Sequence, residues 1–525
     1  MTSDFSNEYA ELIQKAEAAE EKGKWQTALD IYFEALGVFP LQADLWHRAG
    51  ICLQKAGRSN EALQYLEKAS MLSPGTIEFE LERGDIFFNL GRFDEAIEAY
   101  NCILAADPDN ISALNNIGVT LQEAGKIDEA IITLDETNRL APDDPMVQSN
   151  YAAALIKANR PDEALPLLES ATRCNPSYAK SWSNLALTYE ASLRLDKALN
   201  AHARAVSLEP QNASIHYNRA MTYLLLGDFA EGFRSFEFRR YLADRKPREF
   251  EIPEWTNEPL DGAHILVHAE QGIGDTIQFA RFIPLLEDLG ARVSVYVHQS
   301  LNKLAQWFSG TATVLKETPN TTDFDYQIAL LSLPFRLNLK LADVKMEKPY
   351  LSIPANEKVL RKRSQPSVGV VWSGNPRHPN DINRSIPAKM FLPLLSVPNF
   401  TWVILQQGER ANDLVDCSQH ALENSPRFID FADTAKAISE LDLIISVDTS
   451  VAHLAGALGI PVWILLPYLP DWRWLLDRND SPWYSQARLF RQKAPNSWDP
   501  VIAEVKEAIT QRKFHLGKAA SSISG

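Results

Sequence analysis

Alanine, glycine and proline recur along the first half of the chain at a fixed step of 34 residues. Two rows of small residues keep this step: Ala28, Ala62, Ala96, Ala130, Ala164 and Ala198, extended by Gly232, and Ala16, Gly50, Gly84, Gly118, Ala152, Ala186 and Ala220. A proline row contains Pro40, Pro74, Pro108, Pro142, Pro176 and Pro210. A turn row contains Gly23, Gly57, Gly91, Gly125 and Gly227, with Asn159 and Leu193 replacing glycine in two copies. This period predicts stacked copies of one helix–turn–helix unit.

Each row has a physical place in such a unit. Small residues let two helices approach closely, glycine ends the first helix, and proline follows the second helix, which it cannot continue. One copy cannot bury its apolar face, so the copies must stack. The pattern resembles the tetratricopeptide repeat family over about residues 8 to 240. The resemblance implies an α-solenoid over residues 1–240 that binds proteins.

From residue 262 the pattern changes to short apolar runs that alternate with helices. Strands are expected at 264–268, 292–297, 324–331, 368–372, 402–405, 443–447 and 461–466, with a closing helix at 498–512. Strands alternating with helices predict parallel sheets, here an α/β region of two Rossmann-like halves at 262–360 and 361–512 that face a cleft. Residues 241–261 are interpreted as a linker, or as a strap packed by Trp255. Residues 513–525 are expected to be a disordered tail.

Composition narrows the class of protein. The net charge of −16 over 525 residues argues against a nucleic acid or an anionic membrane as partner. The four cysteines have no metal or redox spacing, which favours a reducing cytoplasm, and buried thiols are expected in the repeat helices. The first residues lack a basic region and an apolar core, so no signal peptide is expected. The apolar stretch 451–469 contains glycines and prolines, which favours a helix, a turn and a strand over a membrane span.

Two glycines and an aspartate follow the first expected strand of the α/β region. Gly272, Gly274 and Asp275 stand where a helix opens. Glycine lets the backbone bend closely around a ligand, and a helix N-terminus favours anions. Asp275, at the carboxyl end of a strand, can face the cleft as a general base. Alternatively, it is a first-turn carboxylate that only complements the helix dipole.

A second candidate binding segment follows the strand 443–447. Asp448, Thr449 and Ser450 lie at a helix N-terminus, where free amides and hydroxyls can hold a diphosphate. His453 lies four residues past Thr449 on the same helix face. The alternative interpretation is an ordinary N-cap followed by a core histidine.

Two further candidate binding segments follow the ends of strands in the second half. The first has small residues followed by basic ones, which suit phosphate unless the loop is merely solvated: Ser373, Gly374, Asn375, Arg377, His378 and Arg384. The second, at 471–474, places tryptophans beside charges. They can stack on a sugar or base, or they can pack in the core.

Together, these segments resemble glycosyltransferase family 9, the ADP-heptose heptosyltransferases, which have the two-domain GT-B fold. The resemblance covers about residues 262 to 512. It rests on the Gly-Ile-Gly-Asp loop at 272–275, the Asp-Thr-Ser segment with His453, and the Gly-Ile-Pro-Val strand at 459–462. The match is closer to bacterial proteins that join tetratricopeptide repeats to such a domain, on the segments 372–376, 383–385, 430–434 and 471–474.

The resemblance implies roles for individual residues. Asp275 matches the catalytic base, which takes the proton of the acceptor hydroxyl. The nucleotide-sugar site would comprise Gly272, Gly274, Ser373, Gly374, Asn375, Arg384, Asp448, Thr449, Ser450 and His453. No metal and no cofactor is implied. The turn at 466–469 departs from the Gly-Pro-Thr of heptosyltransferases, so ADP-heptose itself is not implied as the donor.

An asparagine row suggests the acceptor. Asn116, Asn150, Asn184 and Asn218 keep the 34-residue step on the helix expected to line the concave face. Such amides can bond both the N–H and the C=O of an extended peptide. The row resembles the one in the repeats of O-GlcNAc transferase. The alternative is that repeat duplication has left polar residues on a solvated face.

We therefore expect a cytoplasmic, metal-independent, inverting glycosyltransferase that moves a sugar from a nucleotide-sugar to a protein held by the repeats. The alternative is a non-catalytic scaffold with a degenerate GT-B domain.

Overall fold

The computed structural model describes residues 2–242, 248–345, 348–358, 364–378, 380–417, 422–424 and 428–511. The expected tail at 513–525 lies outside these residues. The chain divides into two compact units. The first comprises Met1–Ser192 with Ala203–Glu209, and the second comprises Leu193–His202 with Pro210–Gly525.

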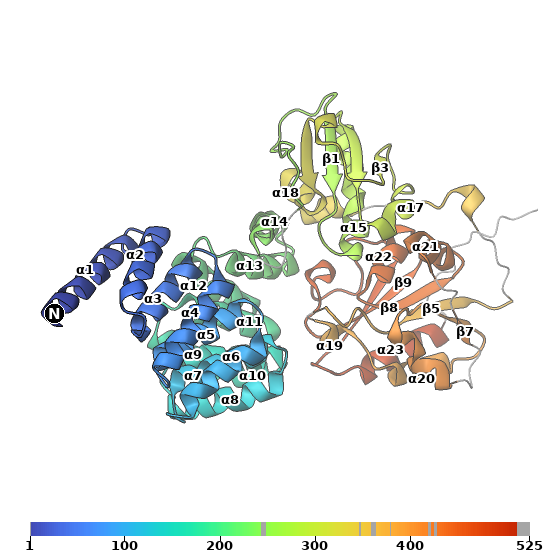
Figure 1. The fold of residues 1–525 in the computed structure, drawn as a ribbon. Coiled ribbons are helices and arrows are strands. Elements are labelled where there is room, and N and C mark those ends of the chain that lie inside the picture. Colours follow the sequence, from blue (N-terminus) through green and yellow to red (C-terminus); the bar gives the residue numbers. More distant parts are fainter. Residues whose placement is uncertain are drawn as a thin grey trace, which may run out of the picture. The chain divides into compact units, whose positions relative to one another are not determined.

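Residues 2–242 are helical pairs joined by short turns, as the 34-residue step predicts (Figure 1). The helices of the first unit are α1 (Thr2–Glu20), α2 (Trp25–Val38), α3 (Ala43–Lys55), α4 (Ser59–Leu72), α5 (Ile77–Asn89), α6 (Phe93–Leu104), α7 (Ile111–Glu123), α8 (Ile127–Leu140), α9 (Pro145–Lys157), α10 (Pro161–Cys174) and α11 (Ala179–Ala191). Helix α12 (Leu195–Leu208) is divided between the units. Helices α13 (Ala213–Leu225) and α14 (Phe229–Phe236) and the 3-10 turn η1 (Glu237–Tyr241) belong to the second.

The rows of small residues and turn residues are confirmed. All alanines of both rows are 0% exposed. A Cβ on Gly84 would overlap the ring of Tyr100, and one on Gly118 would overlap the side chain of Leu134, so helix approach requires glycine there. All seven turn positions have positive φ, including Asn159 at 59° and Leu193 at 54°. The cysteine prediction is only partly right, because Cys52 is buried while Cys102 and Cys174 are exposed.

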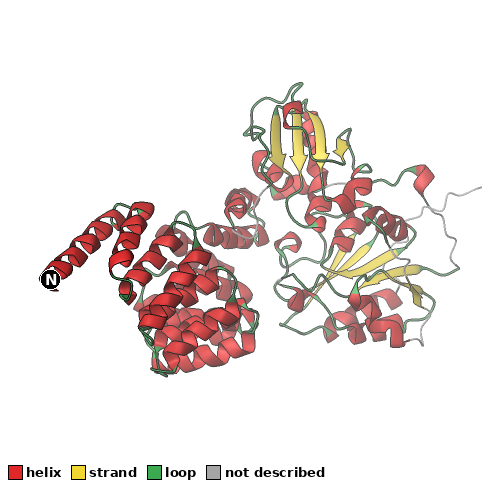
Figure 2. Cartoon of the chain, in the orientation of Figure 1, coloured by secondary structure: helices red, strands yellow, loops and turns green. Residues whose placement is uncertain are grey.

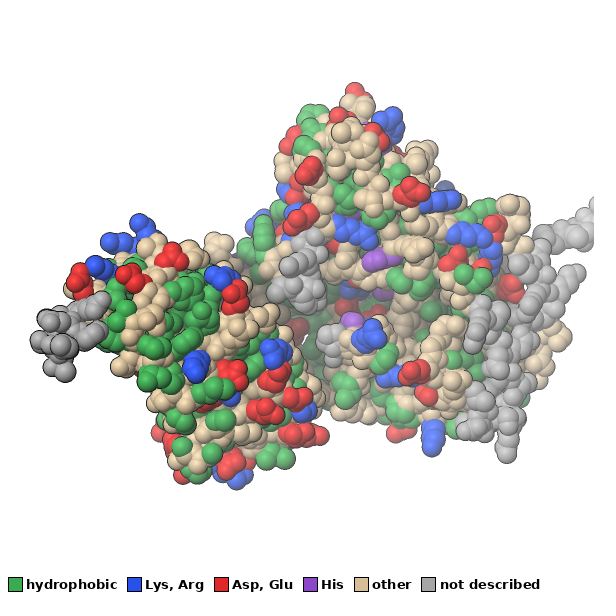
Figure 3. Space-filling view, viewed as in Figure 1, with side chains coloured by type: hydrophobic (Ala, Val, Ile, Leu, Met, Phe, Trp, Pro, Cys, Tyr) green, Lys and Arg blue, Asp and Glu red, His purple; other side chains and the backbone are tan. Residues whose placement is uncertain are grey.

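Hydrophobic side chains also lie on the surface of the first repeats. Phe33, Val38, Leu41 and Met71 are between 37% and 78% exposed, and Figure 3 shows hydrophobic side chains gathered over this part of the repeats. The ring of Phe33 stacks on that of Tyr65, with centroids 5.6 Å apart.

The second unit contains two parallel sheets (Figure 2). The four-stranded sheet has the order β3-β2-β1-β4, with β1 (His264–His268), β2 (Arg292–Tyr296), β3 (Thr313–Leu315) and β4 (Tyr326–Ala329). The six-stranded sheet has the order β10-β9-β8-β5-β6-β7, with β5 (Ser367–Val371), β6 (Thr401–Ile404), β7 (Leu422–Asn424), β8 (Leu443–Val447), β9 (Val462–Leu466) and β10 (Ala487–Arg491). The second order is that of the doubly wound Rossmann fold. Strands β3, β7 and β10 were missed by the sequence pattern.

Helices cover both faces of the six-stranded sheet: α21 and α22 on one side, α20 and α23 on the other (Figure 1). The helices of this region are α15 (Ile273–Phe279), α16 (Ile283–Asp288), α17 (Asn302–Ala305), α18 (Leu333–Arg336), α19 (Asp381–Arg384), α20 (Ala388–Leu395), α21 (Phe431–Ser439), α22 (Ser450–Ala457) and α23 (Asp499–Thr510). The apolar stretch at 451–469 is α22, a turn and β9, as expected. Among the described residues, no helix is long and apolar enough to cross a membrane.

The segment 248–261 is a strap rather than a free linker. Trp255 is 3% exposed and its indole N–H donates to the carbonyl of Glu258. The backbone of the strap pairs with strand β4, because the Trp255 amide donates to the Gln327 carbonyl and the Gln327 amide donates to that of Pro253. The strap therefore extends the edge of the four-stranded sheet.

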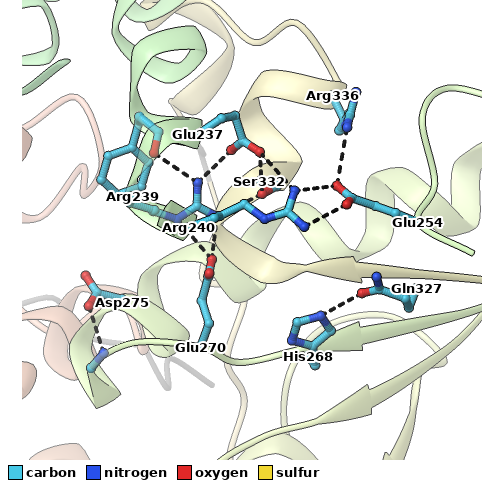
Figure 4. A network of polar contacts seen from close by, with 12 residues as sticks. Glu237, Arg239, Arg240, Glu254, His268, Glu270, Asp275, Gln327, Ser332 and Arg336 are labelled. Carbon is cyan, nitrogen blue, oxygen red and sulfur yellow. Dashed lines mark hydrogen bonds and ion pairs between the residues drawn. The ribbon is translucent and has the colours of Figure 1, made fainter. Parts of the chain in front are cut away.

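The end of the repeats is built into the α/β region. The guanidinium of Arg239, on η1, is 1% exposed and pairs with the carboxylates of Glu237 and Glu270. Beside it, Arg240 makes a bidentate pair with Glu254 of the strap, 2.7 Å for each bond (Figure 4). The compact unit therefore begins before residue 240, where the repeat pattern alone placed the boundary.

Two alanine substitutions should have opposite effects on stability. Gly125→Ala is expected to destabilise the protein by about 1 to 2 kcal/mol, because φ at this turn is +79° and an L-residue pays a steric cost there. Gly37→Ala, in helix α2, should stabilise it by about 0.5 to 1 kcal/mol, because alanine loses less backbone entropy. At neither position would the new Cβ meet an atom within 4 Å. Thermal unfolding followed by circular dichroism measures the stability of both variants. Effects of equal sign would contradict the backbone conformations assigned to the two glycines.

Candidate functional site

A cavity of about 680 Å³ lies at the carboxyl ends of strands β1 and β8. Its lining comes from both sheets: residues 271–275 after β1, residues 374–378 after β5, and residues 448–453 after β8. Strands β5 and β8 are neighbours in the sheet but not in the sequence, so the order of the strands reverses between them. Ligands of open α/β sheets bind at such a reversal.

The glycine loop after β1 brings Asp275 to the cavity. One carboxylate oxygen accepts from the amide of Gly272 at 3.0 Å and so caps helix α15. The other oxygen accepts from the guanidinium of Arg473. A Cβ on Gly274 would lie 3.1 Å from the His453 ring and 3.6 Å from the backbone of Ser450, so α15 approaches α22 closely there. The Asp275 side chain thus caps its helix and also faces the cavity. Both placements expected from the sequence, at the helix start and at the cavity, are therefore observed.

Asp448, Thr449 and Ser450 lie at the start of α22, as predicted. The Thr449 side chain does not cap the helix but bonds with the Ser446 hydroxyl at 3.0 Å, so it leaves the first amides free of a side-chain cap. Burial and the neighbouring charge of Asp471 raise the pKa of Asp448 to about 6.

His453 is 5% exposed and its ring stacks on that of Trp474, with centroids 5.4 Å apart. Burial, followed by the positive charges of nearby arginines, holds its pKa well below the usual value, so the imidazole is neutral. It is a buried histidine, yet it also lines the cavity.

The loop after β5 brings Arg384 across the cavity. Its guanidinium donates to the carbonyl of Asp448 at 3.2 Å and lies so close to Gly374 that a Cβ there would overlap it. Ser373 is 3% exposed, and its amide donates to Gln406 at 3.0 Å. The Asn375 carboxamide accepts from the amide of Arg377. The basic residues of this loop line the cavity, so the loop is more than a solvated connection.

A second cavity of about 730 Å³ adjoins the first. The two share Gly374, Asn375, Arg377, Thr449 and Ser450 in their lining, so they form one continuous crevice. The second cavity extends over Gln406 and Phe431. The hydroxyl of Ser373, which lines it, is buried without a partner in the described residues.

Arg473 is a residue of the site whose role the sequence did not show. Its guanidinium donates to Asp471 at 2.9 Å, to the Gln278 side chain at 2.6 Å, and to Asp275. The flanking Trp472 and Trp474 are 4% and 0% exposed, so the tryptophans are core residues and do not stack on a ligand. The aromatic residues of this motif lie in the core, whereas the charge between them reaches the cavity.

The asparagine row connects neighbouring repeats. The Asn116 amide donates to Asp85 at 3.3 Å, and that of Asn150 donates to Asn115 at 2.9 Å. The Asn184 amide donates to the Ser149 carbonyl at 3.2 Å, and the Lys180 ammonium donates to Asn150 at 2.9 Å. Asn150 is only 4% exposed, while Asn116, Asn184 and Asn218 are partly exposed. Asn116, Asn150 and Asn184 therefore bond between neighbouring repeats, and peptide binding by the row stays a prediction.

Comparison with known proteins identifies the repeats. The tetratricopeptide repeat family matches residues 13–75, 87–154 and 151–206. Protein FlbA of Caulobacter vibrioides is 24% identical over 322 residues, which is 54% of this chain and 53% of FlbA. Tetratricopeptide repeat protein 28 of Mus musculus is 29% identical over 107 residues, 20% of this chain and 4% of that protein. The crystal structure of a tetratricopeptide repeat protein from Parabacteroides merdae aligns with 45% of this chain and 94% of that protein's chain. The sequence identity is 18% and the TM-score is 0.41.

The chain thus spans about half the length of FlbA and a small part of the mouse protein. The matches place tetratricopeptide repeats in the N-terminal region, and repeats of this kind are protein-interaction modules.

Asp448→Asn should stabilise the protein in a pH-dependent way. Because the carboxyl pKa is raised from 3.8 to about 6, the folded state favours the protonated form, and stability is lost as the pH rises through about 6. The asparagine variant avoids this loss. Its free energy of unfolding should equal that of the wild type near pH 4 and exceed it by about 3 kcal/mol at pH 8, at about 1.4 kcal/mol per pKa unit. Urea unfolding followed by tryptophan fluorescence measures it. The exposed Asp288→Asn is the control, and an advantage independent of pH would contradict the assignment.

Proposed function

We propose that the chain is a GT-B glycosyltransferase that moves a sugar from a nucleotide-sugar to an acceptor hydroxyl with inversion, without a metal ion. The convergence of Asp275, the amide-bearing start of α22 and three arginines on one crevice carries the proposal. The resemblance of these same segments to glycosyltransferase family 9 supports it.

The start of α22 suits a diphosphate. Free amides and the positive end of the helix dipole favour anions, and Arg384 lies beside them. The guanidinium of Arg377 lines the same cavity and has no ion-pair partner among the described residues. These groups would stabilise the departing nucleoside diphosphate as its negative charge develops. The adjoining cavity, with Phe431 and the unpartnered hydroxyl of Ser373, would receive the nucleoside.

Asp275 would act as the general base. Its carboxylate pairs with the guanidinium of Arg473, which holds it in the crevice. A bound diphosphate would lie beside the same guanidinium, so Arg473 would contact both the donor and the base. The base would then take the acceptor proton when the donor is in place, during an in-line displacement at the anomeric carbon.

The acceptor would be a protein bound by the repeats. The tetratricopeptide repeats support a protein partner. The partly exposed amides of Asn116 and Asn184 leave hydrogen-bonding capacity for an extended peptide beyond their contacts between repeats. The rival function is a scaffold whose α/β half binds a nucleotide without catalysis, and activity of the wild-type protein separates the two.

Nucleotide binding should occur in the presence of EDTA. A thermal-shift panel of ADP, GDP, UDP and CMP should raise the unfolding temperature with at least one of them. Gly374→Ala should abolish the shift, because the new Cβ would displace the Arg384 guanidinium. The matched control is Gly37→Ala in helix α2, which should bind normally. The absence of any shift in the wild type would favour the scaffold.

Asp275→Asn should retain nucleotide affinity and lower turnover by roughly 10² to 10⁴, the usual contribution of a positioned base. Donor hydrolysis and the mass increase of intact acceptor proteins provide the two measurements. Asp288→Asn, an exposed change in the same half, should leave both unchanged. Full turnover in Asp275→Asn would remove the base from this residue.

A further inference from the structure

The turn after the last repeat helix places an arginine at the edge of the four-stranded sheet. Arg239, on η1, contacts the segments that follow β1 and β4, which are neighbouring strands. Its guanidinium donates to the carboxylate of Glu270, two residues past the end of β1, through Nε at 3.2 Å and also through Nη2. Nη2 donates as well to the hydroxyl of Ser332, in the turn after β4, at 2.8 Å (Figure 4). The end of the repeats therefore supplies one side chain to the carboxyl edge of this sheet.

Every N–H group of the Arg239 guanidinium has an acceptor. Nη1 donates to the carboxylate of Glu237 at 2.6 Å and to the carbonyl of Phe236 at 3.3 Å. A guanidinium carries five N–H groups in a fixed planar fork, and with these two bonds all five are used. Lysine cannot reproduce this arrangement, because an ammonium has three donors and no planar fork. The surroundings of residue 239 are therefore specific for arginine.

The ion pair between Arg239 and Glu270 is buried, with the two side chains 1% and 6% exposed. Within the described residues, no other cation pairs with Glu270. Loss of the arginine would leave a buried carboxylate without compensation, which costs more than the pair itself gains. Glu237 differs, because the Ser332 hydroxyl also donates to it, at 2.9 Å. Glu270 is therefore the carboxylate that depends on Arg239.

Glu270 belongs to the loop that carries the proposed base. This loop runs from the end of β1 to the start of α15, and Asp275 lies in the first turn of that helix. On the strand side, the Ala269 amide donates to the carbonyl at the end of β2 at 2.9 Å. On the helix side, the carbonyl of Gln271 accepts from His298. Between these two backbone contacts, the side chain of Glu270 ties the loop to the end of the repeats.

We propose that Arg239 is a positioning residue of the site. Through Glu270 it fixes the loop that carries Asp275, so the geometry of the α/β site depends on the final unit of the repeats. The hold on the loop rests on the contacts alone. Its effect on turnover rests on the proposed function.

Hydrogen–deuterium exchange of the full-length protein tests the hold on the loop without any ligand. Arg239→Lys keeps the charge but loses the fork. Exchange over residues 269–276 should rise roughly 10-fold or more, the factor expected from one lost hydrogen bond to a charged group. Exchange over the buried strand β8 should stay as in the wild type.

Arg240→Lys is the matched control, because it weakens the adjacent pair with Glu254 and does not touch the loop. A rise over 269–276 no larger than that of the control, or an equal rise in β8, would overturn the proposal. Glu270→Gln approaches the same contact from the loop and decides the question if Arg239→Lys does not fold. It keeps the size of the side chain and removes the charge, so the same rise is expected, and unchanged exchange in this variant would also overturn the proposal.

Turnover tests the link to the proposed base. Glu270→Gln should lower kcat roughly 10-fold and leave KM for the nucleotide-sugar unchanged, because the base is displaced while the start of α22 is not. In the Asp275→Asn background, the same change should have little further effect, since the base is already absent. An equal loss in both backgrounds would mean that Glu270 acts on stability alone, which contradicts the proposal. If the wild type turns over none of the ADP-, GDP-, UDP- and CMP-sugars, the proposed function fails, while hydrogen exchange still decides the hold on the loop.

Discussion

Burial of the last repeat helix in the α/β region is the constraint on which the site depends. Phe229 and Phe233 of α14 are 2% and 1% exposed and pack edge-on against Trp472, with centroids 6.0 and 5.8 Å away. Phe229 also stacks on Trp483 at 5.7 Å. A buried aromatic ring contributes about 3 to 5 kcal/mol when compared with alanine. The residue after Trp472 is Arg473, the partner of Asp275, so the packing of α14 bears directly on the position of the proposed base.

The two halves are joined by buried arginines as well as by aromatic rings. Arg281 extends from the four-stranded half to the carbonyl of Trp483, and Arg473 extends from the other half to Gln278. Each cation is satisfied by several fixed acceptors, which ties the backbone on both sides to one geometry. Removing one partner of such a network leaves an uncompensated buried group, so the cost falls on the whole cluster rather than on one bond. The same contacts that stabilise the unit therefore also hold the side chains of the proposed site in place.

Local patterns predicted most of the fold. The 34-residue rows located the helix ends and turns, since each row reports a steric requirement within one repeat, and the positive φ of Leu193 shows that the turn persists where glycine does not. The strand 443–447 was predicted to the residue because a buried parallel strand is a continuous apolar run. Strands β3, β7 and β10 were missed. The first two have only three residues, and β10 places Arg488 and Arg491 within the strand.

The candidate site was predicted less completely than the fold, because some of its interacting residues lie far apart in the sequence. Residues 272–275 and 448–453 were found because each segment carries its own signal, glycines in one and a strand-to-helix junction in the other. The pairing of Asp275 with Arg473 joins residues 198 positions apart, and Tyr484, whose hydroxyl bonds with Nδ1 of His453, has no local signature at all. The asparagine row shows the converse case. Its period is visible in the sequence, but only the fold shows that its amides bond across the repeats.

That bonding has a consequence for how the solenoid can evolve. Arrays of equivalent repeats gain and lose whole units by unequal recombination, because any copy can follow any other. Here the line from Asp85 through Asn116, Asn115 and Asn150 to Lys180 uses a different pair of side chains at each junction. Excision of one 34-residue unit from this stretch would bring together helices whose polar groups do not match. The repeats between α5 and α11 are therefore not interchangeable in their polar contacts, even though each unit keeps the outline of its neighbours.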